Sequence, residues 1–277
     1  MKIKFIGTGG SEGTPAIFCR CEVCEHARAH QGKYVRTRAG LMIDDELLID
    51  FSPDLYMNSI KFNIYLSKIK GVLFTHSHGD HFFPMDLLAR TKNASINREV
   101  NVLNVYGNSV IREQMIREGW QRSEIIAQSV QMTTLESGKT YEIVGGYHVT
   151  PFVTEHIPTE DCFIYLIQKD GKNYLQCHDS GEPYDWVLEE MQKRGVKLDM
   201  VAIDCTYGMF EKNYGGHMNL NQNILVKKKM EKLGLVDENT LFYATHIAHC
   251  GGSYAAIEEK ANANGIFVAY DGLEVEI

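Results

Sequence analysis

The chain has 277 residues, of which 44% are hydrophobic and 23% are charged, so it can bury a large core in one big domain or two small ones. No apolar run approaches the roughly 18 residues that a membrane span needs, and the start MKIKFIGTGG does not resemble a signal peptide. The net charge of −8 argues against a surface that wraps long nucleic acid, and we expect a cytoplasmic protein without a membrane partner.

Short apolar segments alternate along the chain with segments of helical character. Strands rich in Val, Ile, Phe and Tyr are predicted at 3–7, 41–50, 71–75, 100–107, 141–153, 162–168, 173–177, 200–204, 241–245, 266–270 and 273–277. Helices are predicted near 83–90, 108–120, 183–194, 219–233 and 253–264. Because no linker rich in proline or serine interrupts this alternation, we expect one domain over residues 1–277, with layered sheets covered by helices.

A zinc knuckle is predicted at 19–24, where Cys19, Cys21 and Cys24 follow the spacing C-x-C-x-x-C. Seven cysteines, three of them clustered, fit metal binding in a reducing compartment better than a disulfide framework. A tetrahedral zinc needs a fourth ligand. The candidates for that ligand are His26, His30, His249 and Cys250. His26 leaves little slack after Cys24, and spacing alone leaves Cys250 open; three reduced cysteines without a metal are the simpler alternative.

The segment THSHGDH, residues 75–81, follows an apolar strand and concentrates metal-ligand residues. His76 and His78 lie two positions apart, so both can point to one metal from an extended loop. Asp80 and His81 come after a glycine that lets the backbone turn, and they more naturally serve a second metal nearby. The alternative is a polar surface loop, which does not explain so dense a set of ligands.

The pattern H-x-H-x-D-H after an apolar strand resembles the metallo-β-lactamase superfamily. The resemblance implies an α/β fold, an αββα four-layer sandwich, with a dinuclear metal site at the edge of the two sheets. Further ligands are implied in FVTEHIP, CHDSG and ATHIAH. The implied sets are His76, His78 and His156 on one ion and Asp80, His81 and His246 on the other, with Asp179 shared. Without the resemblance, His156 is equally a loop histidine and Asp179 a turn residue.

Two aspartates at strand ends are predicted to orient metal-bound histidines. Asp50 ends the LLID strand where the superfamily has a carboxylate that supports the histidine loop, and Asp204 ends the MVAID strand. His178 precedes Asp179 and is expected to face away from it, since successive strand residues point to opposite faces. His178 is interpreted as an ordinary polar residue, and so are three other histidines with respect to the histidine loop: His26, His30 and His148.

Within the superfamily, the sequence is most similar to the cyclic phosphodiesterases of bacterial phosphonate degradation. The similarity rests on the G-T-G-G-x-x-G-x-P segment at 7–15, the cysteine triplet, THIAH and YDGLE. In that family the three cysteines and the second histidine of T-H-I-x-H hold a structural zinc, so the resemblance implies a site of Cys19, Cys21, Cys24 and His249. It also implies a homodimer. Several loops over 100–135 differ in length from the family pattern, so the resemblance does not identify the substrate.

The implied reaction is hydrolysis of a small phosphate diester, with a cyclic one expected, by a hydroxide shared between two divalent ions, zinc or manganese. The predicted general acid and phosphate contact is His217 in NYGGHMNLNQ, and Asp80 is counted with it as catalytic. A polar residue at a helix N-terminus is the alternative for His217. A ligand set with two aspartates and a hydroxide leaves two divalent ions with one net positive charge, which favours a diester monoanion.

Other functions remain open on the same residues. A carboxyl hydrolase acting on a lactone or thioester would not require His217. A tRNA 3′-processing endonuclease would need a basic surface, which a net charge of −8 does not favour. A non-enzymatic RNA-binding knuckle would carry basic and aromatic residues, whereas Glu22 and Glu25 stand beside these cysteines.

Overall fold

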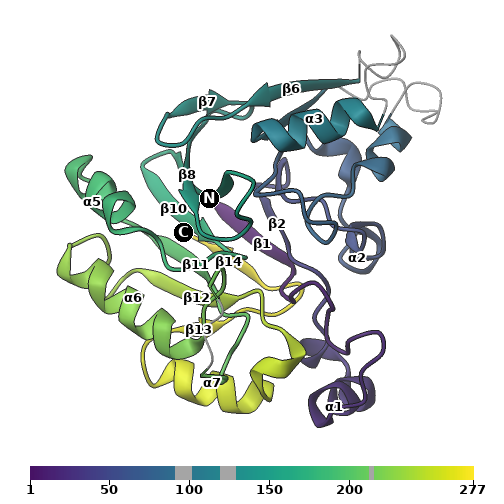
Figure 1. The fold of residues 1–277 in the computed structure, drawn as a ribbon, viewed down its shortest axis with the longest axis vertical. Coiled ribbons are helices and arrows are strands. Elements are labelled where there is room, and N and C mark those ends of the chain that lie inside the picture. The colour runs from purple at the N-terminus through teal and green to yellow at the C-terminus, as the bar shows by residue number, and fades with distance from the viewer. Residues whose placement is uncertain (91–101, 119–128, 212–214) are drawn as a thin grey trace.

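The computed structural model describes residues 1–90, 102–118, 129–211 and 215–277. Two sheets lie face to face, and helices cover the outer face of each one (Figure 1). The predicted αββα four-layer sandwich is therefore confirmed. No helix among these described residues is long and apolar enough to cross a membrane.

The first sheet has the strand order β14-β1-β2-β3-β4-β5-β6. Its strands are β1 (Lys2–Gly7), β2 (Gly40–Ile43), β3 (Leu47–Ile49), β4 (Gly71–Leu73), β5 (Leu103–Gly107), β6 (Val130–Thr134) and β14 (Glu274–Glu276). Strands β14, β1, β2 and β3 pair antiparallel, and β3 to β6 pair parallel. Because β3 and β4 run in the same direction, Asp50 and the histidine loop follow them at one edge of the sheet.

The second sheet has the order β13-β12-β11-β10-β9-β8-β7. Its strands are β7 (Tyr141–Ile143), β8 (Tyr147–Thr154), β9 (Cys162–Lys169), β10 (Lys172–Cys177), β11 (Met200–Asp204), β12 (Leu241–Thr245) and β13 (Phe267–Val268). Strands β10, β11 and β12 are parallel, with Cys177 opposite Ile203 and Asp204 opposite Thr245. This register brings His178, Asp179, Asp204 and His246 to one edge, although the sequence separates them widely.

Three buried clusters form the layers. The helices are α1 (Glu22–His30), α2 (Leu55–Lys61), α3 (Ser109–Arg117), α5 (Asp185–Lys193), α6 (Leu220–Lys232) and α7 (Tyr254–Asn262). Side chains such as Phe5 and Tyr165 fill the space between the two sheets. The outer face of the second sheet packs against α5, α6 and α7, and that of the first sheet packs against α2 and α3. Helix α1 stands apart, near α7, in Figure 1.

Several predicted elements need correction. The expected strand 41–50 is divided into β2 and β3, because Asp44 and Asp45 adopt positive φ (50° and 58°) and reverse the chain. The expected strand 141–153 is divided at Gly145 and Gly146 in the same way. The predicted helix at 83–90 is a 3₁₀ helix, Pro84–Arg90. Residues 100–101 and 119–120 of two expected elements lie outside the described residues.

The sequence analysis missed α1, α2 and β6. The segment EVCEHARAH of α1 has only Cys24 and Ala27 as buried residues, so it lacks the periodic large apolar side chains that predict a helix. Its ends carry charges that suit the helix dipole, with Glu22 and Glu25 in the first turn and Arg28 and His30 in the last. The stability of helix α1 therefore comes from the charges at its two ends and from the buried Cys24 more than from an apolar face packed on the core.

Candidate metal centre

The predicted ligands converge at the edge where strands from both sheets end. Strand β4 leads into the histidine loop, β8 leads to His156, β10 leads to Asp179 and β12 leads to His246. In both sheets a Thr-His pair follows an apolar strand, at Thr75-His76 and Thr245-His246. A rigid sheet edge of this kind fixes loop residues that must meet in space.

The first group of ligand atoms belongs to His76, His78, His156 and Asp179, which lie within 4.8 Å of one another. The Nε2 atoms of His76 and His156 are each 3.0 Å from His78 Nδ1. One ring nitrogen has a single proton at most, so it cannot satisfy both neighbours by hydrogen bonds. A cation between these lone pairs resolves the conflict.

The second group comprises Asp80, His81, His246 and again Asp179. Asp179 Oδ2 is 2.9 Å from His81 Nε2 and 3.6 Å from His246 Nε2. Four buried atoms of this group make no regular hydrogen bond among the described residues, although each has an ion-pair contact at 2.9–3.6 Å: Asp80 Oδ2, His81 Nε2, Asp179 Oδ1 and His246 Nε2. Buried polar atoms are normally satisfied, so these orphaned donors and acceptors fit a metal ion. The structure therefore brings all seven predicted ligands together.

Electrostatics in the cluster favour charged carboxylates and, at His76 and His156, neutral imidazoles, whereas burial would lower the pKa of His81 but Asp50 and Asp179 raise it above its usual range. Burial would raise the pKa of Asp179, but the surrounding histidines, with His246 the largest contributor, hold it well below its usual range. Burial lowers the pKa of His76 to about 4, with His81 adding to the effect, and burial also lowers that of His156 to about 4. A neutral imidazole and an ionised carboxylate are the forms that bind a metal.

Asp50 holds the histidine loop from behind. Its carboxylate accepts from the backbone N–H of Thr75 at 2.8 Å, and its Oδ2 lies 2.6 Å from His81 Nδ1. A proton on His81 Nδ1 leaves Nε2 free to face the cluster. Asp50 itself has φ 63°, a left-handed conformation that few residues other than glycine adopt. The predicted position of Asp50 behind this loop matches the structure.

His178 is a functional candidate that the sequence analysis missed. Its Nε2 lies 2.6 Å from Asp50 Oδ2, and its Nδ1 contacts the side chain of Gln176. Oδ2 of Asp50 thus lies 2.6 Å from a ring nitrogen of His81 and 2.6 Å from a ring nitrogen of His178. As expected, His178 contacts a residue other than Asp179. The interpretation of His178 as an ordinary polar residue is wrong, because its partner is Asp50. Asp50 lies 128 positions away in the sequence, so no spacing pattern could have indicated the pair.

We expect His178→Ala to weaken active-site metal binding about 10–100-fold, the usual effect of losing a partner that orients a ligand. Loss of His178 frees the carboxylate of Asp50 and with it the ring of His81. Metal affinity measured by competition with a chelator checks this. His148→Ala is the control, because His148 is an exposed histidine on β8. Equal affinities in the two variants would contradict the role of His178.

His217 stands at the side of the cluster and is not among the seven ligands. Its Nδ1 is 3.0 Å from Asp179 Oδ1 and 3.5 Å from Asp204 Oδ2. Burial alone would lower the pKa of His217, but these two carboxylates raise it to about 10. These two carboxylates therefore favour the protonated form of His217.

Asp204 is fixed by the turn that follows β11. Its Oδ1 accepts from the backbone N–H of Met218 at 2.7 Å, and its Oδ2 accepts from the Thr206 hydroxyl at 2.7 Å. That same oxygen is 3.3 Å from Nδ1 of His246. Asp204 therefore contacts both His217 and His246, in the orienting position that the sequence predicted.

A cleft of about 240 Å³ opens above these groups. Its lining joins the metal-ligand candidates to His217 and to residues of the N-terminal segment, among them Ser11 and Glu12. Tyr207 and Cys250 complete the wall. The volume suits a small substrate that reaches His217 and the metal-ligand cluster together.

The cysteine triplet forms a separate cluster with His249. The ligand atoms of Cys19, Cys21, Cys24 and His249 lie within 4.8 Å of one another, and Cys21 Sγ is 3.5 Å from His249 Nδ1. Burial would raise the pKa of Cys21, but the hydrogen bond from His249 lowers it to about 6. Three thiols and one imidazole form a closed ligand set of the structural-zinc type. Cys250, the alternative left open by the sequence, is not in the cluster.

Glu12 connects this cluster to the cleft. Its carboxylate is 3.3 Å from His249 Nε2, the nitrogen that does not face Cys21. A carboxylate on the far nitrogen of a ligating histidine fixes the ring and its tautomer. The knuckle and the cleft are therefore adjacent, with Glu12 in contact with both.

We expect Cys24→Ser to lose about one equivalent of zinc per chain and to unfold at a lower temperature, because structural zinc binding contributes directly to folding. Elemental analysis and a thermal melt measure the two effects. Cys250→Ser is the matched control and should keep its zinc. Loss of zinc from Cys250→Ser as well as from Cys24→Ser would show that Cys250 is a ligand, and zinc retained by Cys24→Ser would contradict the site.

Known proteins resemble this chain in sequence and in fold. A model of the β-lactamase superfamily domain matches residues 46–247. An octanoyltransferase of Porphyromonas gingivalis is 32% identical over 111 residues, 38% of this chain and 22% of that protein. A ribonuclease Z of Lactobacillus delbrueckii is 31% identical over 98 residues, 35% of this chain and 31% of that protein. The chain thus matches less than a third of the length of these curated relatives.

Solved structures share the fold along almost the whole chain. A diphosphatase from the PhnP family superposes with a TM-score of 0.74 at 23% identity, covering 100% of this chain and 97% of that one. Zn²⁺-bound PqqB from Methylobacterium extorquens gives 0.75 at 20% identity, with 100% of both chains covered. The short form of human tRNase Z gives 0.65 at 17%, covering 100% of this chain and 99% of that one.

Proposed function

The chain belongs to the β-lactamase superfamily, and on that premise we propose that it is a metal-dependent phosphodiesterase that hydrolyses a small, cyclic phosphate diester. The observation that carries the proposal is His217, which lines the cleft, contacts Asp179 and Asp204, and is not one of the seven ligands expected from the sequence. Carbonyl hydrolysis on the same ligands has no need of such a group, whereas a phosphate diester offers both an anion to bind and an alkoxide to protonate.

We propose that the two groups of ligand atoms hold two divalent ions, with Asp179 shared between them. Such ions supply Lewis-acid activation of water and of the phosphoryl oxygens. Zinc suits the five histidines and two aspartates of the set, and manganese tolerates the same mixture. The cysteine cluster would hold a third ion, a structural zinc.

Charge supports a diester over a monoester. Asp80 and Asp179 are the two carboxylates of the ligand set, so two divalent ions would leave the centre positive until a hydroxide and a substrate anion are present. A diester brings one negative charge and a monoester brings two at neutral pH. The monoanion therefore balances the site, while the dianion exceeds it.

The chain's own residues then have distinct tasks. His217 contacts the phosphate and donates its Nε2 proton to the leaving alkoxide, since its Nδ1 is held by Asp179 and Asp204. Asp204 keeps that ring in place, and Asp50 does the same for His81. Asp80 also lines the cleft and is the second residue that the sequence analysis counted as catalytic. The predicted homodimer is a further proposal.

Hydrolysis rates across substrate classes test the proposal. Metal-loaded protein is given cyclic sugar and nucleotide phosphates, a linear aryl diester, an aryl monoester, a lactone and a precursor tRNA. We expect the cyclic diesters to turn over fastest. Rapid lactone hydrolysis with inert diesters would show a carboxyl hydrolase, and preferential cleavage of the tRNA would show the activity named for the ribonuclease Z relatives.

A further inference from the structure

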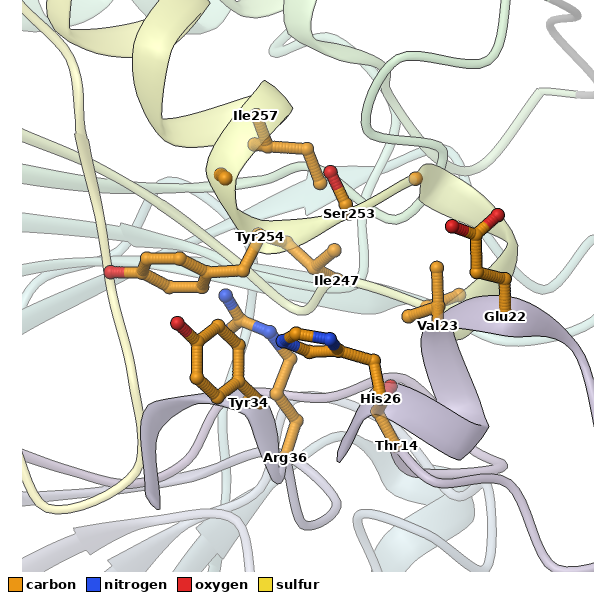
Figure 2. Close-up of a pocket in the computed structure, with 13 residues that line it drawn as sticks. Thr14, Glu22, Val23, His26, Tyr34, Arg36, Ile247, Ser253, Tyr254 and Ile257 are labelled. Atoms are coloured by element: carbon orange, nitrogen blue, oxygen red, sulfur yellow. The ribbon is translucent and has the colours of Figure 1, made fainter. Parts of the chain in front are cut away.

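A second cavity, of about 550 Å³, lies between α1 and the N-terminal end of α7. Figure 2 shows its polar end, where Arg36 reaches between the rings of Tyr34, His26 and Tyr254. None of the seven proposed active-site ligands, and none of the four knuckle residues, lines it. Its volume falls within the range of small-molecule sites, roughly 300–1,000 Å³.

Arg36 is a buried cation with an unused donor. Only 5% of its surface is exposed, and its Nη1 donates to Thr8 Oγ1 and to the Ala269 carbonyl, both at 2.7 Å. Its Nη2 is buried and has no hydrogen-bond partner among the described residues. Leaving a charged donor unsatisfied is costly, and an anion would remove that cost.

The nearby carboxylate of Asp271 does not accept a hydrogen bond from Arg36 Nη2. Asp271 uses Oδ1 to accept from the backbone N–H and the hydroxyl of Thr8, and Oδ2 to accept from the same two groups of Thr37. No ion pair joins Asp271 to Arg36 in the described part of the chain. The charge of Arg36 is therefore only partly compensated from within the protein.

The walls of the cavity are flat and apolar. The Tyr34 ring stands edge-on to Tyr254, with centroids 5.9 Å apart, and to His26, at 4.6 Å. The guanidinium carbon of Arg36 lies 5.5 Å from the Tyr254 centroid. Ile247 and Ile257 add aliphatic surface. Because these rings contact one another, they form one continuous aromatic wall, against which an aromatic ring packs better than a flexible chain does.

The first turn of α7 provides a second source of positive potential. This helix has nine residues, and Tyr254 and Ala255 at its start line the cavity. The Ser253 hydroxyl accepts from the backbone N–H of Ala256 at 3.2 Å, and the helix dipole still favours a negative group at this end. Both Arg36 and α7 therefore favour an anion in the same space, while the exposed Glu22 at its border disfavours a second negative charge.

We propose that this cavity is a binding site for an aromatic monocarboxylate, with the carboxylate on Arg36 Nη2 and the ring against the wall formed by Tyr34, His26 and Tyr254. One unused donor and one helix end suit a single negative charge. The site is independent of the hydrolytic reaction, since it shares no residue with the catalytic cleft other than Ala248.

Calorimetric titration of the metal-loaded protein with cinnamate tests the proposal, with cinnamamide and cyclohexanecarboxylate as controls. We expect one cinnamate per chain. The neutral amide should bind about 10–100-fold more weakly, because it loses the charge-assisted hydrogen bond. The non-aromatic acid should also bind more weakly. Equal binding of the amide, or no cinnamate binding at millimolar concentration, would overturn the proposal.

Two neighbouring alanines locate the site. Ala255 and Ala256 are both exposed in the first turn of α7, but only Ala255 lines the cavity. Ala255→Trp should fill the space and abolish cinnamate binding, while Ala256→Trp should keep it. Arg36→Gln should weaken binding, with a thermal melt to confirm folding. Unchanged binding in folded Ala255→Trp would mean that cinnamate binds elsewhere, for example at the active-site metals, and would overturn the proposal.

Discussion

Asp179→Asn is expected to lower kcat/KM for diester hydrolysis by more than about 10³-fold, because several kcal/mol of charge stabilisation by the metal ions would be lost and each 1.4 kcal/mol is about tenfold. Asp179 Oδ2 lies 3.2 Å from His76 Nε2, 2.9 Å from His81 Nε2 and 3.3 Å from His156 Nε2. Asparagine at position 179 would remove the negative charge that lies between the histidine nitrogens of both ligand groups.

Metal content after gel filtration and the rate at saturating metal measure the two parts of this effect. Asp170→Asn is the matched control: Asp170 is exposed on a turn and also has a positive φ, 51° against 49° for Asp179. It should keep the wild-type rate and metal content. Full activity in Asp179→Asn would contradict the shared-ligand assignment.

His217→Ala is expected to reduce kcat by about 10²–10⁴-fold while the metal content stays unchanged, which is the range for loss of a general acid. His217 is outside the ligand set, so its loss should not release an ion. Its effect should also be larger for a diester with a poor leaving group than for an activated aryl diester, whose leaving group needs no proton. A loss of metal equal to the loss of rate would show that His217 acts only through the ligands.

The pH profile follows from the direction of the pKa shift of His217. In the proposed mechanism its acid form is the active one, so we expect the rate to fall as pH rises through the pKa. Burial lowers that pKa, whereas Asp179 and Asp204 raise it to about 10. Asp204→Asn removes one of the two carboxylates and should move the alkaline limb to lower pH. The rate is measured at saturating metal, because Asp204 also contacts His246; an unmoved limb would exclude His217 as the titrating group.

Much of the sheet architecture could be predicted, because buried strands have a strong apolar pattern. The strand prediction was wrong where the local backbone conformation reverses the chain. Asp44 and Asp45 resemble interior strand residues in LMIDDELLID, but both have positive φ and form the turn between β2 and β3. Helix α1 was missed because it has almost no apolar face.

For the candidate site, the ligand-type residues of the histidine loop were visible in the sequence, while their distant partners were named only through a family resemblance. His178 and Arg36 were beyond both approaches. Each acquires its significance from a contact made in three dimensions, with Asp50 in one case and with the wall formed by α7 in the other. Such contacts depend on the register of strands and the packing of layers, which a single sequence does not display.

The most direct measurement is the rate of cyclic diester hydrolysis as metal is titrated into protein that retains the proposed zinc of the cysteine cluster. The proposed centre predicts a rate that rises until about two further equivalents are bound per chain and then stays constant. A rate that is already maximal without added ions, or a titration in which only lactone hydrolysis rises, would contradict a metal-dependent phosphodiesterase.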